Sequence, residues 1–257
     1  MKGGPVNDSK TRRARFMLAG IGILTAGVLV GGGVTAAVVL GGDDSHNGGA
    51  SPKPTATAST PHGTPQSRMT PDKARKLELQ PPTGQKNGLS TGFSDGPVGA
   101  ISTAVHFWEE YAFLDDQKAR QQLDAIVSPD AGGYVDEQVS DVRALRERIG
   151  LPPSGGTPAG ITFSTTVNAV RPTSLDETGK VIQIWINFDR YATNADGSPD
   201  DEPLREQTTD LLLKQQDGIW KLTNEPQYRK KRSFARAYFP DSHVSWQDGW
   251  RQVRHAG

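Results

Sequence analysis

The chain contains no cysteine, and this absence excludes several kinds of site at once. None of its 257 residues can form a disulfide, a zinc–cysteine or iron–sulfur centre, or a thiol nucleophile. A folded domain must therefore be held by its own apolar core, which is feasible for about 160 residues. An excess of charge is also lacking, because 29 basic side chains balance 29 acidic ones. This balance argues neither for nor against a nucleic-acid partner, since local clusters can still bind phosphate.

Internal repeats and metal-binding histidine pairs are missing as well. No repeat of about 20–50 residues indicates a solenoid, and no two histidines have H-x-x-x-H spacing. Four of the five histidines, at positions 46, 62, 243 and 255, fall in segments expected to be tether or tail. A zinc site is therefore not expected, and we predict no cofactor.

Long apolar runs are confined to residues 16–40, and this run organises the chain. It reads FMLAGIGILTAGVLVGGGVTAAVVL, 25 residues without a charge. At about 1.5 Å per residue, a helix of this length exceeds the roughly 30 Å of hydrocarbon in a bilayer. Basic residues precede the run and acidic ones follow it, which predicts a cytoplasmic stub at 1–15 and an extracellular remainder. The prediction is a single-pass protein of the cell membrane.

A cleaved signal peptide is the alternative interpretation of the same run. A signal peptide normally has an apolar core of about 7–15 residues that ends at a small-residue site. Here the apolar residues 38–40 continue past the small residues 35–37.

Small residues also recur every fourth position within the span, which lets membrane helices pack closely. The residues predicted to mediate self-association are Gly22, Ala26, Gly27 and Gly31.

Residues 41–92 are predicted to be a disordered tether, and residues 93–257 a folded external domain. The tether includes SPKPTATASTPHGTPQ, which has almost nothing to bury. A brief helix over 71–79 is the only element expected there. In the domain, apolar residues at helical spacing predict helices over 97–114, 116–127 and 133–149, with Asp95 as the first N-cap.

The periodicity then changes to two, which predicts four strands over 161–169, 182–189, 204–216 and 219–224. Between the last two, Asp217-Gly218 predicts a type I′ hairpin turn. The fold class is α+β: a single N-terminal transmembrane helix, then a cone-like curved antiparallel sheet of about four strands covered by three helices.

The closing sequence DLLLKQQDGIWKLTN, with Asp217, Gly218 and Trp220, resembles the end of nuclear transport factor 2-like cone domains. Joined to a stub and one span, the layout looks like the bitopic scaffold subunit of type IV secretion systems and of Gram-positive conjugation. The segment TGFSDGPVGAISTAVHFWEEY is similar to one in membrane-anchored actinobacterial proteins, through Gly92-Phe93 and Gly99-Ala100. The resemblance implies fold and topology over about 93–224, and no catalytic motif is matched.

Two groups of residues suggest acid–base chemistry, each beside a plainer interpretation. His106 precedes Glu109 and Glu110 and could be a general base, or it could lie at the edge of the buried stripe. Asp189, Asp210 and Tyr191 could line the cone and abstract a proton, or lie on a solvated sheet face. The acidic loop 196–202 lacks the ligand order of a calcium site and is expected to be solvated.

The densest basic cluster outside the stub comes after the last predicted strand. Basic and aromatic residues alternate there, and such patterns bind phosphates, acidic proteins or anionic lipid. Two tryptophans four residues apart then predict a short amphipathic helix that packs on the domain or docks on a partner. The residues predicted to contact a partner or an anion are Arg229, Lys230, Lys231, Arg232, Arg236, Trp246 and Trp250.

These observations favour a non-catalytic scaffold in an envelope assembly for conjugation or secretion, with other envelope proteins and a second copy of the chain as partners. A nucleic acid is a less favoured partner. The first alternative is a surface domain whose cone holds a lipid or small metabolite. The second is a cone-fold isomerase or hydratase, which requires a buried aspartate with a shifted pKa facing an open cavity.

Overall fold

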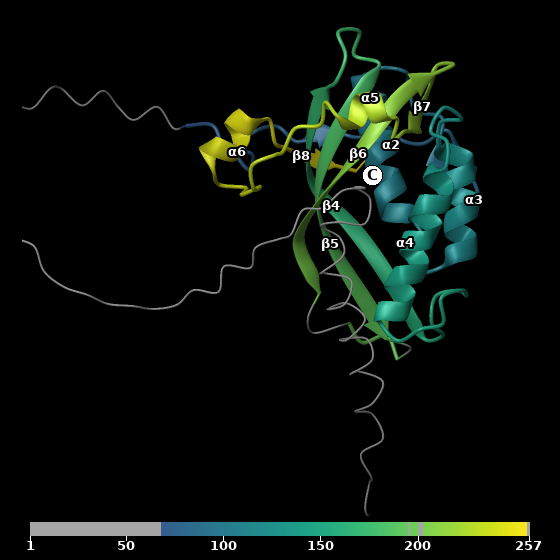
Figure 1. The fold of residues 1–257 in the computed structure, drawn as a ribbon. Helices are drawn as coiled ribbons and strands as arrows, with labels where there is room; N and C mark the ends of the chain where they lie inside the picture. The colour runs from purple at the N-terminus through teal and green to yellow at the C-terminus, as the bar shows by residue number, and fades with distance from the viewer. Residues whose placement is uncertain (1–67, 195, 200–202, 256–257) are drawn as a thin grey trace, which may run out of the picture.

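The computed structural model describes residues 68–194, 196–199 and 203–255, which form a mixed α+β fold on one strongly curled sheet (Figure 1). This confirms the α+β class predicted for the domain, but the main sheet has six strands and not the predicted four. The stub, the apolar run with its small residues at positions 22–31, and most of the tether lie outside the described residues. Among the residues that are described, no helix is long and apolar enough to cross a membrane.

Six strands form the main sheet and two more form a separate hairpin. They are β1 (Leu77–Glu78), β2 (Gly84–Lys86), β3 (Leu89–Thr91), β4 (Ile161–Ser174), β5 (Val181–Asn194), β6 (Leu204–Gln216), β7 (Ile219–Leu222) and β8 (Arg251–Arg254). The main sheet has the order β1-β8-β4-β5-β6-β7, and β2 pairs with β3. Strands β4 to β7 are antiparallel neighbours, as predicted. Positive φ angles at Asp217 (53°) and Gly218 (74°) agree with the predicted type I′ turn.

Three helices, α2 (Pro97–Glu110), α3 (Asp116–Ile126) and α4 (Tyr134–Arg148), lie on the inner face of the sheet (Figure 1). Helix α2 is capped by Gly96, not by Asp95 as predicted, and it ends before residue 114. The early end has a visible cause in the buried side chain of Gln122. Its amide donates to Glu110 O at 2.9 Å and its carbonyl accepts from Ala112 N at 2.8 Å. These two bonds take the place of a further helical turn.

Alternation along β5 places its apolar residues in the core against the helices. Ile182, Ile184, Ile186 and Phe188 belong to the main apolar cluster, together with Trp108 of α2. This is the face that the periodicity predicts. Burial of this face against α2, α3 and α4 is the main source of the stability of the domain.

A β-bulge corrects the prediction for strand β4. The residues of β4 from position 161 to Ala169 were expected to alternate regularly, with Ala169 on the same face as Val167. The register shifts between these two residues, so Val170 joins Val167 in the main core and Ala169 faces the opposite side. An extra residue in one strand reverses the face of every residue that follows it.

The boundary predicted at residue 92 is wrong, because the folded domain includes residues 68–92. Leu79 and Leu89 are buried in the main core. Strand β1 pairs in parallel with β8, and Leu79 N donates to Arg254 O at 3.0 Å. The helix predicted over 71–79 is absent from this described segment. The expected tether therefore ends before residue 68.

The C-terminal segment covers the outer face of the sheet, opposite the three helices. It includes the short helices α5 (Pro226–Arg229) and α6 (His243–Asp248), and α6 lies across the sheet from α3 and α4 in Figure 1. Gln183, Asn187 and Asp210 point to this face and are no more than 2% exposed. The outer face is thus polar, as the alternation predicts, but it is covered and not solvated.

The amphipathic helix predicted through the tryptophans is broken between them. Helix α6 ends at Asp248, and Gly249 takes the left-handed conformation (φ 101°) that terminates helices. Trp246 therefore lies on the helix, stacked with Arg251 at 3.4 Å from the ring centre. Trp250 lies beyond it and is fully buried with Ala169. The tail packs on the domain, which was one of the two expected roles.

Glycine at position 99 is required by a close backbone approach. A Cβ there would lie 1.8 Å from the carbonyl oxygen of Ser94, which no side-chain rearrangement can relieve. We expect Gly99→Ala to lower the free energy of unfolding by about 1–3 kcal/mol, as overpacking typically does. Gly96→Ala is the matched control, because a Cβ at Gly96 meets nothing closer than 4.0 Å. Chemical denaturation would test this, and equal losses would contradict it.

Candidate functional site

The segment 228–239, which we call the basic-aromatic segment, crosses the outer face of the sheet without regular secondary structure after Arg229. Its backbone must therefore find hydrogen-bond partners elsewhere. Side chains of β5 provide them: Gln183 accepts from Ser233 N at 2.9 Å, and Trp185 Nε1 donates to Ser233 O at 2.8 Å. Asp248 accepts from Arg236 N at 3.0 Å. Side chains of β5 and α6 thus hold the backbone of this segment in place.

The side chains of the basic-aromatic segment divide into anchors and exposed groups. Arg232 is an anchor, because its guanidinium bonds both oxygens of the buried Asp210 carboxylate. Phe234 is 76% exposed and Phe239 is 54% exposed. Exposed residues of the predicted contact set are Arg229, Lys230, Lys231 and Arg236. Two of the predicted contact residues are therefore corrected. Trp250 is buried and cannot reach a partner in this conformation. Arg232 stabilises the fold through its ion pair with Asp210.

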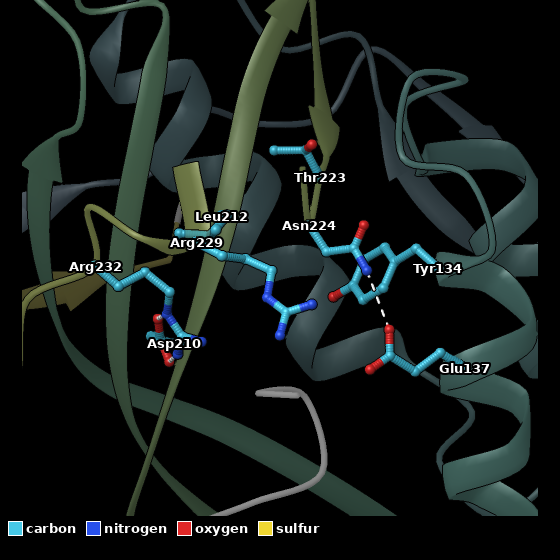
Figure 2. Close-up of a pocket in the computed structure, with 8 residues that line it drawn as sticks. All are labelled: Tyr134, Glu137, Asp210, Leu212, Thr223, Asn224, Arg229 and Arg232. Carbon is cyan, nitrogen blue, oxygen red and sulfur yellow. Dashed lines mark hydrogen bonds and ion pairs between the residues drawn. The ribbon is translucent and has the colours of Figure 1, made fainter. Parts of the chain in front are cut away.

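A small pocket opens beside this segment, at the edge of β6 beyond the end of β7 (Figure 2). Arg229 and Arg232 enter it from the segment, and Tyr134 and Glu137 enter it from α4 (Figure 2). The free space is about 20 Å³, which is roughly the room that one water molecule needs. Its lining residues are Tyr134, Glu137, Asp210, Leu212, Thr223, Asn224, Arg229 and Arg232.

Two contacts between lining residues connect elements of the fold across the pocket, the Arg232–Asp210 ion pair and a hydrogen bond between Asn224 and Glu137. Asp210 also accepts from Gln183 Nε2 at 2.8 Å, and Glu137 accepts from Asn224 Nδ2 at 3.1 Å (Figure 2). Burial raises the pKa of Tyr134 above its usual value. Burial likewise raises the pKa of Asp210, against the opposing charge of Arg232. The pocket residues thus connect α4, β6 and the basic-aromatic segment. The free space of the pocket is too small for a substrate.

A wider hollow of about 470 Å³ lies where the end of α3, the start of α4 and β7 meet. Val127, Pro129 and Val135 contribute apolar surface, while Arg120 and Asp136 form an ion pair at its rim. It is separate from the cone interior, where the metabolite alternative places its ligand.

The aspartates proposed for acid–base chemistry do not line the cone. Asp189 and Asp210 lie on the outer face, because core residues such as Phe188 and Leu211 precede or follow them in the alternation. Asp210 pairs with Trp185 across the strands, which puts Asp189 about 13 Å farther along at roughly 3.4 Å per residue. Asp189 instead accepts from Glu206 N at 2.8 Å, at a register shift between β5 and β6. This removes the geometry on which the proton-abstraction hypothesis depends.

The region around His106 is a cluster of histidine and glutamate side chains that the sequence showed only in part. His106 stacks on Phe93, and its Nδ1 lies 3.8 Å from Glu110 Oε1. His255, assigned by sequence to the tail, reaches both oxygens of Glu109 at 2.9 Å. Burial alone would raise the pKa of Glu110, but the nearby His106 and the hydrogen bonds from Ser90 outweigh it and lower that pKa.

Metal coordination has little support in the described part of the chain. No group of three or more histidine, aspartate or glutamate side chains there could hold a metal ion. In the acidic loop, Asp196 accepts from Ser198 N at 2.9 Å. Residues 195 and 200–202 of this loop lie outside the described residues.

The half-buried Asp141 of α4 gives the domain a predictable pH dependence. Burial, aided by the charge of Glu137, raises the pKa of Asp141 to about 6, against about 3.9 in an unfolded chain. Between these values the native state holds a proton that the unfolded state has lost, so stability falls as the pH rises through this window. We expect Asp141→Asn to raise the melting temperature at pH 7.5 by a few degrees and to leave it unchanged near pH 4.

A pH series of thermal unfolding curves would test this prediction. Asp124→Asn on α3 is the matched control, because Asp124 is exposed. The prediction fails if both variants behave alike at pH 7.5, or if Asp141→Asn is destabilising there.

Comparisons of this chain with protein-family models, with curated proteins and with solved structures gave no match.

Proposed function

We propose that this chain is a non-catalytic, single-pass envelope protein whose α+β domain binds a partner protein through the basic-aromatic segment. The observation that carries the proposal is the exposure of Phe234 and Phe239, at 76% and 54%, on a backbone held in place by side chains of β5. Exposed aromatic rings beside arginine are typical of protein interfaces. Because the segment is already ordered, binding would cost little conformational entropy.

The chemistry of the surface indicates an acidic partner with an apolar depression. Lys230, Lys231 and Arg236 are exposed in the same segment as the two rings, while Arg232 is neutralised by Asp210. A nucleic acid is less favoured, because phosphate binding usually uses a larger excess of positive charge than this surface carries.

The apolar run 16–40 supports anchoring in the cell membrane, with the domain outside and residues 41–67 as its tether. We propose that the anchored protein belongs to a conjugative transfer or secretion assembly and that it self-associates. The support is the order of stub, span and α+β domain, and the small residues at Gly22, Ala26, Gly27 and Gly31. Recovery of the full chain from the cytosol, or a mature terminus beyond Ala37, would contradict the anchor.

Site-specific photo-crosslinking of the full chain in intact cells would test the interface. A photoreactive residue at position 234 or 239 is expected to give one discrete protein adduct that nuclease treatment leaves intact. The matched control is position 219, because Ile219 is 59% exposed but lies outside the segment. Lys230→Glu combined with Arg236→Glu is expected to abolish the adduct without changing the melting temperature, because both side chains are exposed.

Two outcomes would overturn the proposed interface. One is equal crosslinking from positions 219 and 234, which would show no preference for the segment. The other is an adduct that survives both charge reversals, because the proposed partner is acidic. Loss of the adduct on nuclease treatment would favour a nucleic acid instead.

A further inference from the structure

The core of the domain contains an arginine with no counter-ion in the described part of the chain. Arg190 of β5 is only 1% exposed. Its Nε donates to Thr165 Oγ1 at 3.0 Å, but its Nη2 has no hydrogen-bond partner among the described residues. Burial lowers the pKa of Arg190 to about 9, so the guanidinium is still charged at neutral pH. A buried charge without a partner of opposite sign is strongly unfavourable.

Aromatic rings surround this guanidinium and compensate only part of that cost. Its central carbon lies 3.7 Å from the ring centre of Phe113, 5.3 Å from that of Phe188 and 5.5 Å from that of Trp108. Cation–π contacts stabilise a desolvated cation to a degree well below the cost of removing it from water. The rings also supply no acceptor in the plane of the guanidinium, where its N–H groups point.

Two more buried polar groups in the same region also lack partners. One is Nε1 of Trp108, near the end of α2, and the other is Oη of Tyr111, the residue that follows α2. Tyr111 is close enough to Arg190 for the arginine charge to oppose the rise in the tyrosine pKa that burial causes. All three of these atoms can donate a hydrogen bond, so one acceptor placed among them would satisfy three donors.

A second buried arginine shows that this fold can satisfy such a group with its own atoms. Arg146 is 3% exposed, and its guanidinium donates to three backbone carbonyls, those of Leu114, Pro152 and Gly156. Backbone oxygens thus accept hydrogen bonds from the Arg146 guanidinium, whereas Nη2 of Arg190 has no acceptor among the described residues.

We propose that the interior of the cone binds a compact monovalent anion, a halide or the carboxylate of a small molecule, between Arg190, Tyr111 and Trp108. An anion would accept hydrogen bonds from the three unpaired donors and would also neutralise the guanidinium. A water molecule could accept hydrogen bonds but would leave the charge of the guanidinium uncompensated. Phe113 is partly exposed and covers the guanidinium, so rotation of its ring would give an anion a way in. This inference is independent of the proposed interface.

Thermal unfolding of the full-length chain at constant ionic strength would test the site. The protein would first be dialysed into sodium gluconate, whose anion is much bulkier than the compact anions that the proposal requires. Replacement of gluconate by chloride, or by formate, is expected to raise the melting temperature along a saturating curve, as ligand binding requires. A response to chloride identifies a halide site, and a response to formate alone identifies a carboxylate site. Equal melting temperatures in all three anions would overturn the proposal.

Variants and diffraction would locate the effect. Arg190→Met is expected to abolish the anion dependence, and Arg146→Met is expected to keep it. Tyr111→Phe removes one donor and should weaken anion binding about tenfold; this conservative change keeps the proposal testable if Arg190→Met fails to fold. Crystals grown in bromide should show an anomalous peak beside Arg190 Nη2. A water molecule there in place of bromide, or unchanged anion dependence in both Arg190→Met and Tyr111→Phe, would refute the site.

Discussion

Replacement of Trp250 by alanine is expected to lower the free energy of unfolding by about 3–5 kcal/mol, the usual cost of removing a large buried aromatic side chain. Trp250 is fully buried on the outer face of the sheet, against Ala169 and Tyr238. Its Nε1 also donates to Arg236 O at 2.8 Å, so it fixes the end of the basic-aromatic segment. Urea unfolding would measure the loss.

The neighbouring tryptophan provides the control for this prediction. Trp246 is only partly buried and stacks on Arg251 at the surface, so Trp246→Ala should cost about 1 kcal/mol or less. Comparable losses in the two variants would mean that the tail is not packed as described. A Trp250→Ala variant with unchanged stability but reduced partner binding would restore this residue to the contact surface.

Replacement of Arg232 by methionine is expected to cost a similar amount, about 3–5 kcal/mol at neutral pH, because it leaves the Asp210 carboxylate buried without its cation. The Asp210 side chain is fully buried and the Arg232 side chain is 18% exposed. Burial already raises the pKa of Asp210, and loss of Arg232 would raise it further. The carboxyl group would then take up a proton as the pH falls, so the loss should shrink under acidic conditions.

Two further variants would show that the loss comes from the unpaired charge. Asp210→Asn combined with Arg232→Met should recover most of the stability, because no buried charge remains. Arg229→Met, an exposed arginine that lines the same pocket, should change stability by less than about 1 kcal/mol. A loss that did not depend on pH, or that the double variant failed to recover, would contradict the explanation.

Much of the fold was predictable because periodicity reports which face of an element meets the core. The alternation through Ile182, Ile184 and Ile186 identified β5, and Asp217-Gly218 identified the hairpin between β6 and β7. Local signals failed where the partner is distant in sequence. Strands β1 and β8 are two and four residues long, and they exist because they pair with strands far along the chain.

One missed element did have a local signal. Asn87-Gly88 takes positive φ angles of 53° and 78° and connects β2 to β3. An Asn-Gly pair between two short extended segments is the strongest short-range mark of a hairpin. The preceding residues are rich in proline, threonine and serine. Because this composition is typical of a disordered segment, the predicted tether extended to residue 92 and the hairpin signal was missed.

The sequence predicted where the basic residues of the candidate site cluster, but not which of their side chains are exposed. The sequence identified the basic cluster, but it could not separate the exposed Lys230 from Arg232, because the difference depends on Asp210 beneath the segment. The unpaired arginine at position 190 was concealed for the same reason. Only the packing of Phe113 and Trp108 around it shows that a charged side chain lies inside the core.

The pairing of β1 with β8 has a consequence for biosynthesis. The first and last strands of the described domain lie side by side in the sheet, and Glu78 pairs with Arg254 through both backbone and side chains. Strand β4 therefore has no neighbour on the β8 side until residues 251–254 have left the ribosome. Folding that depends on such long-range contacts is slow, and while a nascent chain waits, its unpaired edge is a place where chaperones would be needed.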